Sequence, residues 1–260
     1  MARRLPRLLA LTAALATALT VLAAAPAQAA AQDYVALGDS YSSGTGTGSY
    51  IETGCYTSTH AYPYQLAQQI GANFSFKACS GARTGDVLNN QVSALNANTD
   101  LVTISIGGND AGFADVVTQC NIPFSNCNDD IANANSYIAN TLPGKLDAVY
   151  DQISSRAPNA RVIVVGYPKL FKGNNCSVIN GISAAERTAL NDTADRLSGT
   201  IGNRAAAHGF TYADARSTFG GHAICDSPSW INGLSWPIIE SYHPNRLGHD
   251  GYTSLVAGKL

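Results

Sequence analysis

Residues 34–44 read Tyr-Val-Ala-Leu-Gly-Asp-Ser-Tyr-Ser-Ser-Gly, a short apolar run that reaches a glycine and continues into small polar side chains. Two further runs have the same form: Leu-Val-Thr-Ile-Ser-Ile over 101–106 and Arg-Val-Ile-Val-Val over 161–165. Continuous runs rich in β-branched residues are typical of strands that are buried on both faces of a parallel sheet. Residues 74–76 and 210–212 are shorter candidate strands.

Helical patterns separate these runs, at about 60–70, 130–156 and 184–207. Strands that alternate with helices predict right-handed crossovers and a parallel sheet with helices on both faces. No repeat or Pro-rich linker divides the chain after its N-terminal segment. We therefore expect one α/β domain, a three-layer α/β/α sandwich around a mostly parallel sheet of about five strands. The stretch 214–240 is expected to be a loop before the last helix.

The first 29 residues have the composition of an export signal. Arg3, Arg4 and Arg7 form a basic segment, residues 8–25 carry no charge, and Ala-Gln-Ala over 27–29 supplies a small-x-small cleavage site. We expect residues 1–29 to be a cleaved secretory signal peptide, residues 30–260 to form the domain, and the protein to be secreted. An uncleaved membrane anchor is the alternative.

The charge content is low and excludes a nucleic-acid partner. Only 13% of the residues are charged, with 16 Lys+Arg against 18 Asp+Glu and no basic run. Removal of the three arginines with the signal segment leaves 13 basic residues against 18 acidic ones, a net charge of −5. Such a chain has little with which to neutralise a phosphate backbone.

An even number of cysteines follows the signal segment: Cys55, Cys79, Cys120, Cys127, Cys176 and Cys225. In an exported chain this predicts three disulfides. The sequence does not choose among the pairings, although nearest-neighbour pairing would join 55 with 79, 120 with 127 and 176 with 225. A structural zinc site is not expected, because no C-x-x-C or close Cys/His group is present.

Polar residues follow the predicted strands where a parallel sheet binds its ligands, at the carboxyl ends of the strands. The segments are Gly-Asp-Ser over 38–40, Ala-Cys-Ser-Gly-Ala-Arg-Thr over 78–84 and Gly-Gly-Asn-Asp over 107–110, with Ser-Tyr-His-Pro over 241–244 before the last helix. A serine hydroxyl, a histidine, an asparagine amide and a glycine N–H would meet at one edge. That set suits acyl transfer to a serine, with an imidazole as base and N–H donors for the oxyanion.

These blocks resemble those of the SGNH hydrolase superfamily, the GDSL lipases and esterases, over residues 33–255. The likeness is greatest to the secreted actinomycete lipases and phospholipases. The resemblance implies the SGNH hydrolase fold with its flavodoxin-like sheet, Ser40 as nucleophile and His243 as general base. It also implies an oxyanion hole formed by the N–H groups of Ser40 and Gly81 and the side-chain amide of Asn109.

The third catalytic group is left open by the same resemblance. Many members have an aspartate three residues before the histidine, where this chain has Glu240. Some secreted actinomycete members use a main-chain carbonyl instead, and Ser241 supplies the corresponding one. We favour a dyad of Ser40 and His243 whose imidazole is oriented by the Ser241 carbonyl, with Glu240 as the alternative.

The predicted reaction is the hydrolysis of a carboxylic ester in acyl lipids, by a lipase, an esterase or a phospholipase A1. A carbohydrate acetyl esterase is the alternative, and a noncatalytic binding module is a weaker one. We expect no cofactor and no metal, a lipid or small-molecule ester as partner, at most transient contact with lipid interfaces, and a monomer. Five apolar residues before His243 line an acyl groove or belong to the core: Trp230, Leu234, Trp236, Ile238 and Ile239.

Two other features invite functional interpretations that we do not favour. The run Gly-Thr-Gly-Thr-Gly over 44–48 imitates a nucleotide-binding loop but lacks its glycine spacing, so a flexible loop is expected. Asp39 and Asp110 flank the predicted nucleophile and amide, and we expect them to support their loops by hydrogen bonds rather than bind a metal.

Overall fold

Five parallel strands form the sheet of this computed structural model, in the order β2-β1-β3-β4-β5. The strands are β1 (Asp33–Gly38), β2 (Asn73–Phe76), β3 (Leu101–Ser105), β4 (Arg161–Val165) and β5 (Thr211–Ala213). The structure describes residues 31–122, 126–173, 176 and 181–260, so the predicted signal peptide, residues 1–29, lies outside the described residues. The strand order is that of flavodoxin-like sheets and confirms the predicted fold class.

Burial follows the position of each strand in the sheet. The three central strands β1, β3 and β4 are almost entirely buried, whereas the edge strands β2 and β5 are partly exposed. This is why the central strands are long apolar runs in the sequence and the edge strands are short and weakly marked.

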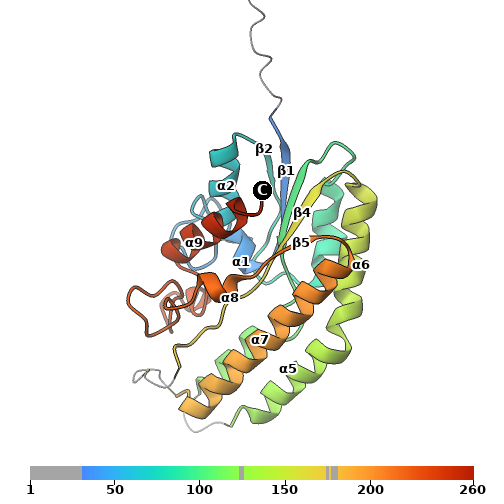
Figure 1. Cartoon of the computed structure of the whole chain (residues 1–260). Helices are drawn as coiled ribbons and strands as arrows, with labels where there is room; N and C mark the ends of the chain where they lie inside the picture. The colour runs from blue at the N-terminus through green and yellow to red at the C-terminus, as the bar shows by residue number, and fades with distance from the viewer. Residues whose placement is uncertain (1–30, 123–125, 174–175, 177–180) are drawn as a thin grey trace, which may run out of the picture. The chain divides into compact units, whose positions relative to one another are not determined.

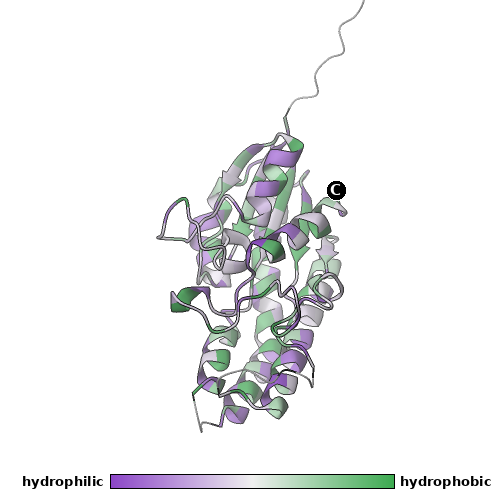
Figure 2. Cartoon of the chain, turned by 90° about the vertical axis from the view of Figure 1, so that its left-hand side faces the viewer, coloured by the Kyte–Doolittle hydropathy of each residue, from purple (hydrophilic) through white to green (hydrophobic). Residues whose placement is uncertain are grey.

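Helices cover both faces of the sheet (Figure 1). On one face lie α2 (Tyr62–Ile70), α8 (Ala215–Thr218) and α9 (Arg246–Ala257). The other face carries α5 (Asn128–Asn140), α6 (Leu142–Arg156) and α7 (Ala184–Ala207). Most helices carry both hydrophilic and hydrophobic residues, as Figure 2 shows, because one side of each helix packs on its neighbours.

The helices differ from the prediction in three places, one of which is the short helix α8, inside the stretch 214–240 that was expected to be a loop. The stretch predicted as one helix over 130–156 is two, α5 and α6, which meet at Thr141. Pro143 explains the break, since proline lacks an N–H and fits only the first turn of a helix. The sequence interpretation also missed α4 (Phe113–Cys120) and a helical segment formed by α3 (Thr84–Asp86), η1 (Val87–Gln91) and η2 (Val92–Ala94).

Three disulfides join the nearest-neighbour cysteines, Cys55 to Cys79, Cys120 to Cys127 and Cys176 to Cys225. The first one links the loop before α2 to the segment that follows β2. Within the described ranges, the structure has no helix of the length and apolarity that a membrane span requires.

Candidate active site

The end of β1 places Ser40 beside β3. Gly38 pairs with Ser105, and the Asp39 N–H donates to the Ser105 carbonyl at 2.9 Å. A Cβ on Gly38 would lie 2.4 Å from that carbonyl oxygen, so the close approach requires glycine. Asp39 then caps the short helix α1 (Ser40–Ser43), with its carboxylate accepting from the Tyr41 N–H at 3.0 Å.

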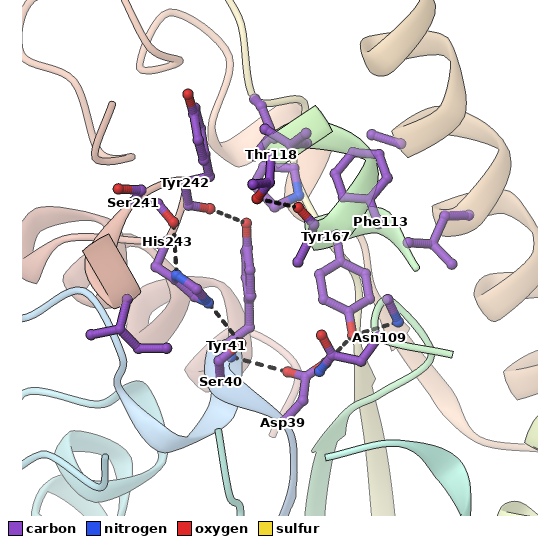
Figure 3. A pocket seen from close by; sticks show the side chains of 18 of the residues that line it. Asp39, Ser40, Tyr41, Asn109, Phe113, Thr118, Tyr167, Ser241, Tyr242 and His243 are labelled. Carbon is purple, nitrogen blue, oxygen red and sulfur yellow. Dashed lines mark hydrogen bonds between the residues drawn. The ribbon is translucent and has the colours of Figure 1, made fainter. Parts of the chain in front are cut away.

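Ser40 and His243 are hydrogen-bonded, 203 positions apart in the chain (Figure 3). The distance from Ser40 Oγ to His243 Nε2 is 2.8 Å, and that from His243 Nδ1 to the Ser241 carbonyl oxygen is 2.9 Å. A carbonyl only accepts hydrogen bonds, so Nδ1 carries the proton. Nε2 therefore presents its lone pair to the Ser40 hydroxyl, as a base would.

The backbone conformation of Tyr242 determines the path of residues 241–243. Its φ is 62°, in the left-handed region that few residues other than glycine adopt. This conformation accompanies the short contact between the Ser241 carbonyl and the His243 ring two residues on. Tyr41 stabilises it by donating its hydroxyl proton to the Tyr242 carbonyl at 2.8 Å, and the Tyr242 N–H donates to the Asn232 carbonyl at 3.0 Å.

The glycine run 44–48 packs against the segment that carries His243. Thr45 and Thr47 are buried, and a Cβ on Gly46 would lie 2.8 Å from the His243 Cβ and 2.5 Å from the Pro244 carbonyl oxygen. The run is a loop, as expected, and Gly46 allows its close packing against the histidine segment.

The Glu240 carboxylate is hydrogen-bonded to Tyr50 and not to His243. It accepts from the Tyr50 hydroxyl at 2.7 Å, and that hydroxyl accepts from the Gly46 N–H at 3.2 Å. Burial and the carboxylate of Glu240 raise the pKa of Tyr50 to about 12, so the phenol stays protonated. Glu240 therefore ties the glycine run to the segment before His243.

Of the three predicted oxyanion donors, Ser40 and Asn109 line one cavity, whereas Gly81 lies on an exposed turn outside its lining. Asn109 donates one amide hydrogen to the Ala82 carbonyl at 3.0 Å, which links the Gly81 turn to the segment after β3. The Cys79 N–H fixes the same turn to the Gly38 carbonyl at 3.0 Å. Within the described part of the chain, no acceptor takes the N–H of Ser40 or of Gly81.

Asp39 connects the Ser40 and Asn109 segments through Tyr167. The Tyr167 hydroxyl donates to the Asp39 carboxylate and accepts from the Gly108 N–H at 3.2 Å. Burial raises the pKa of Asp39 to about 7, and the hydrogen bonds from Tyr167 and the Tyr41 N–H oppose that shift. The sequence interpretation missed Tyr167, although it follows β4 at the same edge of the sheet.

Asp110 supports a neighbouring loop in a similar way. Its carboxylate accepts from the Thr84 N–H at 2.9 Å and from the Thr84 hydroxyl. Both aspartates thus form the loop contacts expected of them.

Burial favours the neutral form of His243. It lowers the pKa of the imidazole from 6.5 to about 4, while the carbonyls of Ser241 and Ile239 oppose the shift. The ring is therefore free to accept a proton at neutral pH.

A cavity of about 370 Å³ opens beside Ser40 and His243. Its walls come from α1, α4, α7, the residues after β4 and the segment 234–243. Its lining includes one carboxylate, that of Asp39, and no Lys or Arg among the described residues. Most of the lining is apolar: Phe113, Ala114, Val117, Pro168, Leu170, Ala194, Leu197, Leu234, Ile238 and Ile239.

The five candidate groove residues divide into three groups. Leu234, Ile238 and Ile239 line the cavity. Trp230 instead stacks on His222, with ring centroids 3.9 Å apart, and packs against Phe219. Trp236 lies outside the cavity and is almost fully exposed.

The described residues bring Cys120, Cys127 and Glu186 close enough to share a metal ion. The two sulfur atoms are bonded to each other, however, so neither is available as a thiolate ligand.

Comparisons with known proteins agree with this arrangement. A family model described as the GDSL-like Lipase/Acylhydrolase family matches residues 36–250. Lipase 1 of Streptomyces coelicolor is 52% identical over 203 residues, which cover 76% of this chain and 75% of that protein. The crystal structure of an extracellular lipase from Streptomyces rimosus has a TM-score of 0.85 at 48% identity, covering 88% of this chain and 100% of that one.

A second solved structure, phospholipase A1 from Streptomyces albidoflavus NA297, also has a TM-score of 0.85, at 45% identity, and covers 89% of this chain and 100% of that one. The family match confirms the resemblance found in the sequence blocks. The chain therefore belongs to the GDSL-like Lipase/Acylhydrolase family and is a carboxylic ester hydrolase.

Proposed function

We propose that this protein is a secreted lipase or esterase that cleaves acyl-lipid esters through an acyl-enzyme on Ser40. The observation that carries the proposal is an apolar cavity that begins at the hydrogen-bonded pair of Ser40 and His243. Its volume, about 370 Å³, falls within the usual range of small-molecule sites, about 300–1,000 Å³.

The proposed reaction begins with attack of Ser40 Oγ on the ester carbonyl carbon, while His243 Nε2 takes the hydroxyl proton. The Nδ1–H bond to the Ser241 carbonyl holds the ring in the required tautomer. The oxyanion of the tetrahedral intermediate accepts from the N–H groups of Ser40 and Gly81 and from the second amide hydrogen of Asn109. Collapse expels the alcohol, which receives its proton from His243, and water then releases the acid by the same steps in reverse.

The substrate class follows from the cavity lining. An apolar wall without Lys or Arg suits a hydrocarbon chain and gives a sugar few polar partners. The relatives named as a lipase and a phospholipase A1 support an acyl-lipid substrate for this chain as well. We propose that the protein acts as a monomer outside the cell after removal of residues 1–29, in keeping with its three disulfides and with the solved relative named as extracellular.

The test is hydrolysis of p-nitrophenyl esters from acetyl to palmitoyl by residues 30–260, with Ser40→Ala alongside. We expect turnover that extends to long acyl chains and disappears in Ser40→Ala. Turnover of acetyl esters alone would favour the acetyl esterase, and turnover that survives in Ser40→Ala would exclude Ser40 as the nucleophile.

Substitution of Ala194 should change the preferred chain length. Ala194 is buried on α7 and faces the cavity, so Ala194→Phe places a ring in space that the acyl chain would occupy. We expect kcat/KM for palmitoyl esters to fall by about tenfold or more, in keeping with the few kcal/mol at stake when a chain loses apolar contacts. Butyryl esters should be affected by less than about threefold. An equal loss on both esters would place the acyl chain elsewhere.

The pH dependence of kcat/KM should show that the His243 imidazole stays neutral down to acid pH. Because burial lowers the pKa of His243 to about 4, kcat/KM should stay high as the pH falls through 6.5, where an ordinary histidine gains its proton, and decline only well below it. Asp39, with a pKa of about 7, titrates in the same window, so Asp39→Asn serves as the control. An acid limb centred at or above 6.5 in both proteins would contradict a buried neutral base.

A further inference from the structure

The segment Leu-Ser-Trp-Pro-Ile-Ile over 234–239, here called the rim segment, exposes large apolar side chains to solvent. The exposed fractions are 89% for Trp236, 58% for Ile238, 45% for Leu234 and 37% for Ile239. No charged residue occurs between positions 227 and 239. Single exposed apolar residues are ordinary, but four within six positions form a patch of the kind that contacts another apolar surface.

The rim segment is also a wall of the cavity. Leu234, Ile238 and Ile239 line it, while Trp236 projects outside. Across the cavity, Ala114 and Thr118 of α4 are exposed as well, and Ile122 just beyond α4 is 49% exposed. Among the described residues, apolar side chains therefore run from the outside of the rim segment into the cavity, whose one lining carboxylate, that of Asp39, is buried.

Hydrogen bonds hold the rim segment in place. The Ser235 N–H donates to Ser241 Oγ at 2.9 Å, and the Glu240 N–H donates to the Pro237 carbonyl at 3.0 Å. The segment is thereby fixed to the residues that carry the Ser241 carbonyl and His243. The apolar patch is a built surface at a fixed position relative to Ser40.

We propose that the rim segment is a lipid-docking surface, which inserts Trp236 and its apolar neighbours into the surface of a lipid aggregate. The inference rests on the proposed function and names the physical form of its substrate. Insertion at this point lets one acyl chain pass from the aggregate into the cavity along a continuous apolar path. Trp is the side chain most suited to the boundary between water and lipid, since its ring is apolar and its indole N–H remains hydrated.

The lack of charged residues in the rim segment favours a lipid surface over a protein as its partner. Residues 30–260 carry 13 basic and 18 acidic side chains, so the protein as a whole is not attracted to anionic headgroups. The nearest acid along the chain, Glu240, follows the rim segment, and its carboxylate is hydrogen-bonded to Tyr50 and is not one of the four exposed apolar side chains. Binding through the rim segment should therefore depend on apolar contact and persist at high salt.

The first experiment measures binding without turnover. Ser40→Ala protein of residues 30–260 is sedimented with phosphatidylcholine vesicles and compared with Ser40→Ala/Trp236→Ser. Leu260→Ser in the same background is the matched control, because Leu260 is 41% exposed at the far end of α9 from the histidine segment. Trp236→Leu tests whether another apolar side chain substitutes.

We expect Trp236→Ser to weaken vesicle partition at least tenfold, Trp236→Leu to weaken it less, and Leu260→Ser to leave it unchanged, in 0.1 M and 1 M NaCl alike. Equal partition of the Trp236→Ser protein would overturn the proposal. Loss of all binding at 1 M NaCl would overturn it as well, since an electrostatic contact would then be responsible. A dimer in sedimentation analysis that Trp236→Ser dissociates would assign the patch to a second copy of the chain instead.

The second experiment uses active protein to separate docking from chemistry. With Ser40 intact, Trp236→Ser should retain turnover of soluble p-nitrophenyl butyrate within about twofold and lose at least tenfold on emulsified long-chain esters. Equal losses on both substrates would contradict docking. If wild type cleaved neither ester, the proposed function would fail, and the vesicle partition of Ser40→Ala would still decide the docking proposal by itself.

Discussion

His243→Ala is expected to lower kcat by about 10⁴-fold or more, whereas Glu240→Ala should lower it by no more than about threefold. Without the imidazole, nothing takes the proton of the Ser40 hydroxyl, whose Oγ lies 2.8 Å from Nε2 in the native site. Without Glu240, the hydrogen bond from Nδ1 to the Ser241 carbonyl remains, because the lost contact is the one to Tyr50. The measurement is kcat on a soluble butyryl ester for both variants, with thermal unfolding to check that each is folded.

Tyr50→Phe supplies the matched control. It removes the same hydrogen bond as Glu240→Ala from the other side, so the two variants should have similar kcat and similar Tm. A loss of 10³-fold or more in Glu240→Ala but not in Tyr50→Phe would make Glu240 the catalytic acid. In that case the carboxylate would have to leave Tyr50 and reach His243 during the reaction.

The convergence of Ser40 and Asn109 could be predicted because it depends on local rules. Each residue follows a buried apolar run, and parallel strands in register place such residues at one edge. The pairing of Gly38 with Ser105 realises that expectation directly. The strand order could likewise be predicted, since the resemblance to the SGNH hydrolases over nearly the whole chain implied a flavodoxin-like sheet.

The contacts that shape the site could not be predicted, because they join distant segments. Tyr242 has a left-handed backbone whose carbonyl and N–H are bonded to Tyr41 and Asn232, and nothing in its neighbours along the chain marks that conformation. Gln91 is a similar case, since its side-chain amide bonds to both the N–H and the carbonyl of Gly38 at 2.7 and 2.9 Å. The rotamer of Glu240 also depends on Tyr50, 190 positions away.

Asn109→Ala is expected to lower kcat by about 10²–10³-fold with little change in KM, the usual cost of removing one side-chain donor from an oxyanion hole. One amide hydrogen of Asn109 is bonded to the Ala82 carbonyl, so its orientation is fixed before substrate arrives and the second hydrogen remains available. The negative charge forms only in the transition state and the intermediate, which is why the loss should fall on kcat. The measurement is steady-state kinetics on butyryl and palmitoyl esters.

Thr118→Ala is the control for Asn109→Ala, because Thr118 lines the same cavity but its hydroxyl donates to the Ala114 carbonyl of its own helix. Its kcat should stay within about threefold of wild type. Asn109→Ala also removes the bond to Ala82, so part of any loss would come from displacement of the Gly81 turn. Asn109→Asp loses the same bond to Ala82 and in addition places a negative charge that repels the oxyanion, so it should be slower than Asn109→Ala. Activity in Asn109→Asp equal to or above that of Asn109→Ala would contradict an oxyanion contact of this side chain, because both variants lose the bond to Ala82 and only the aspartate adds a repelling charge.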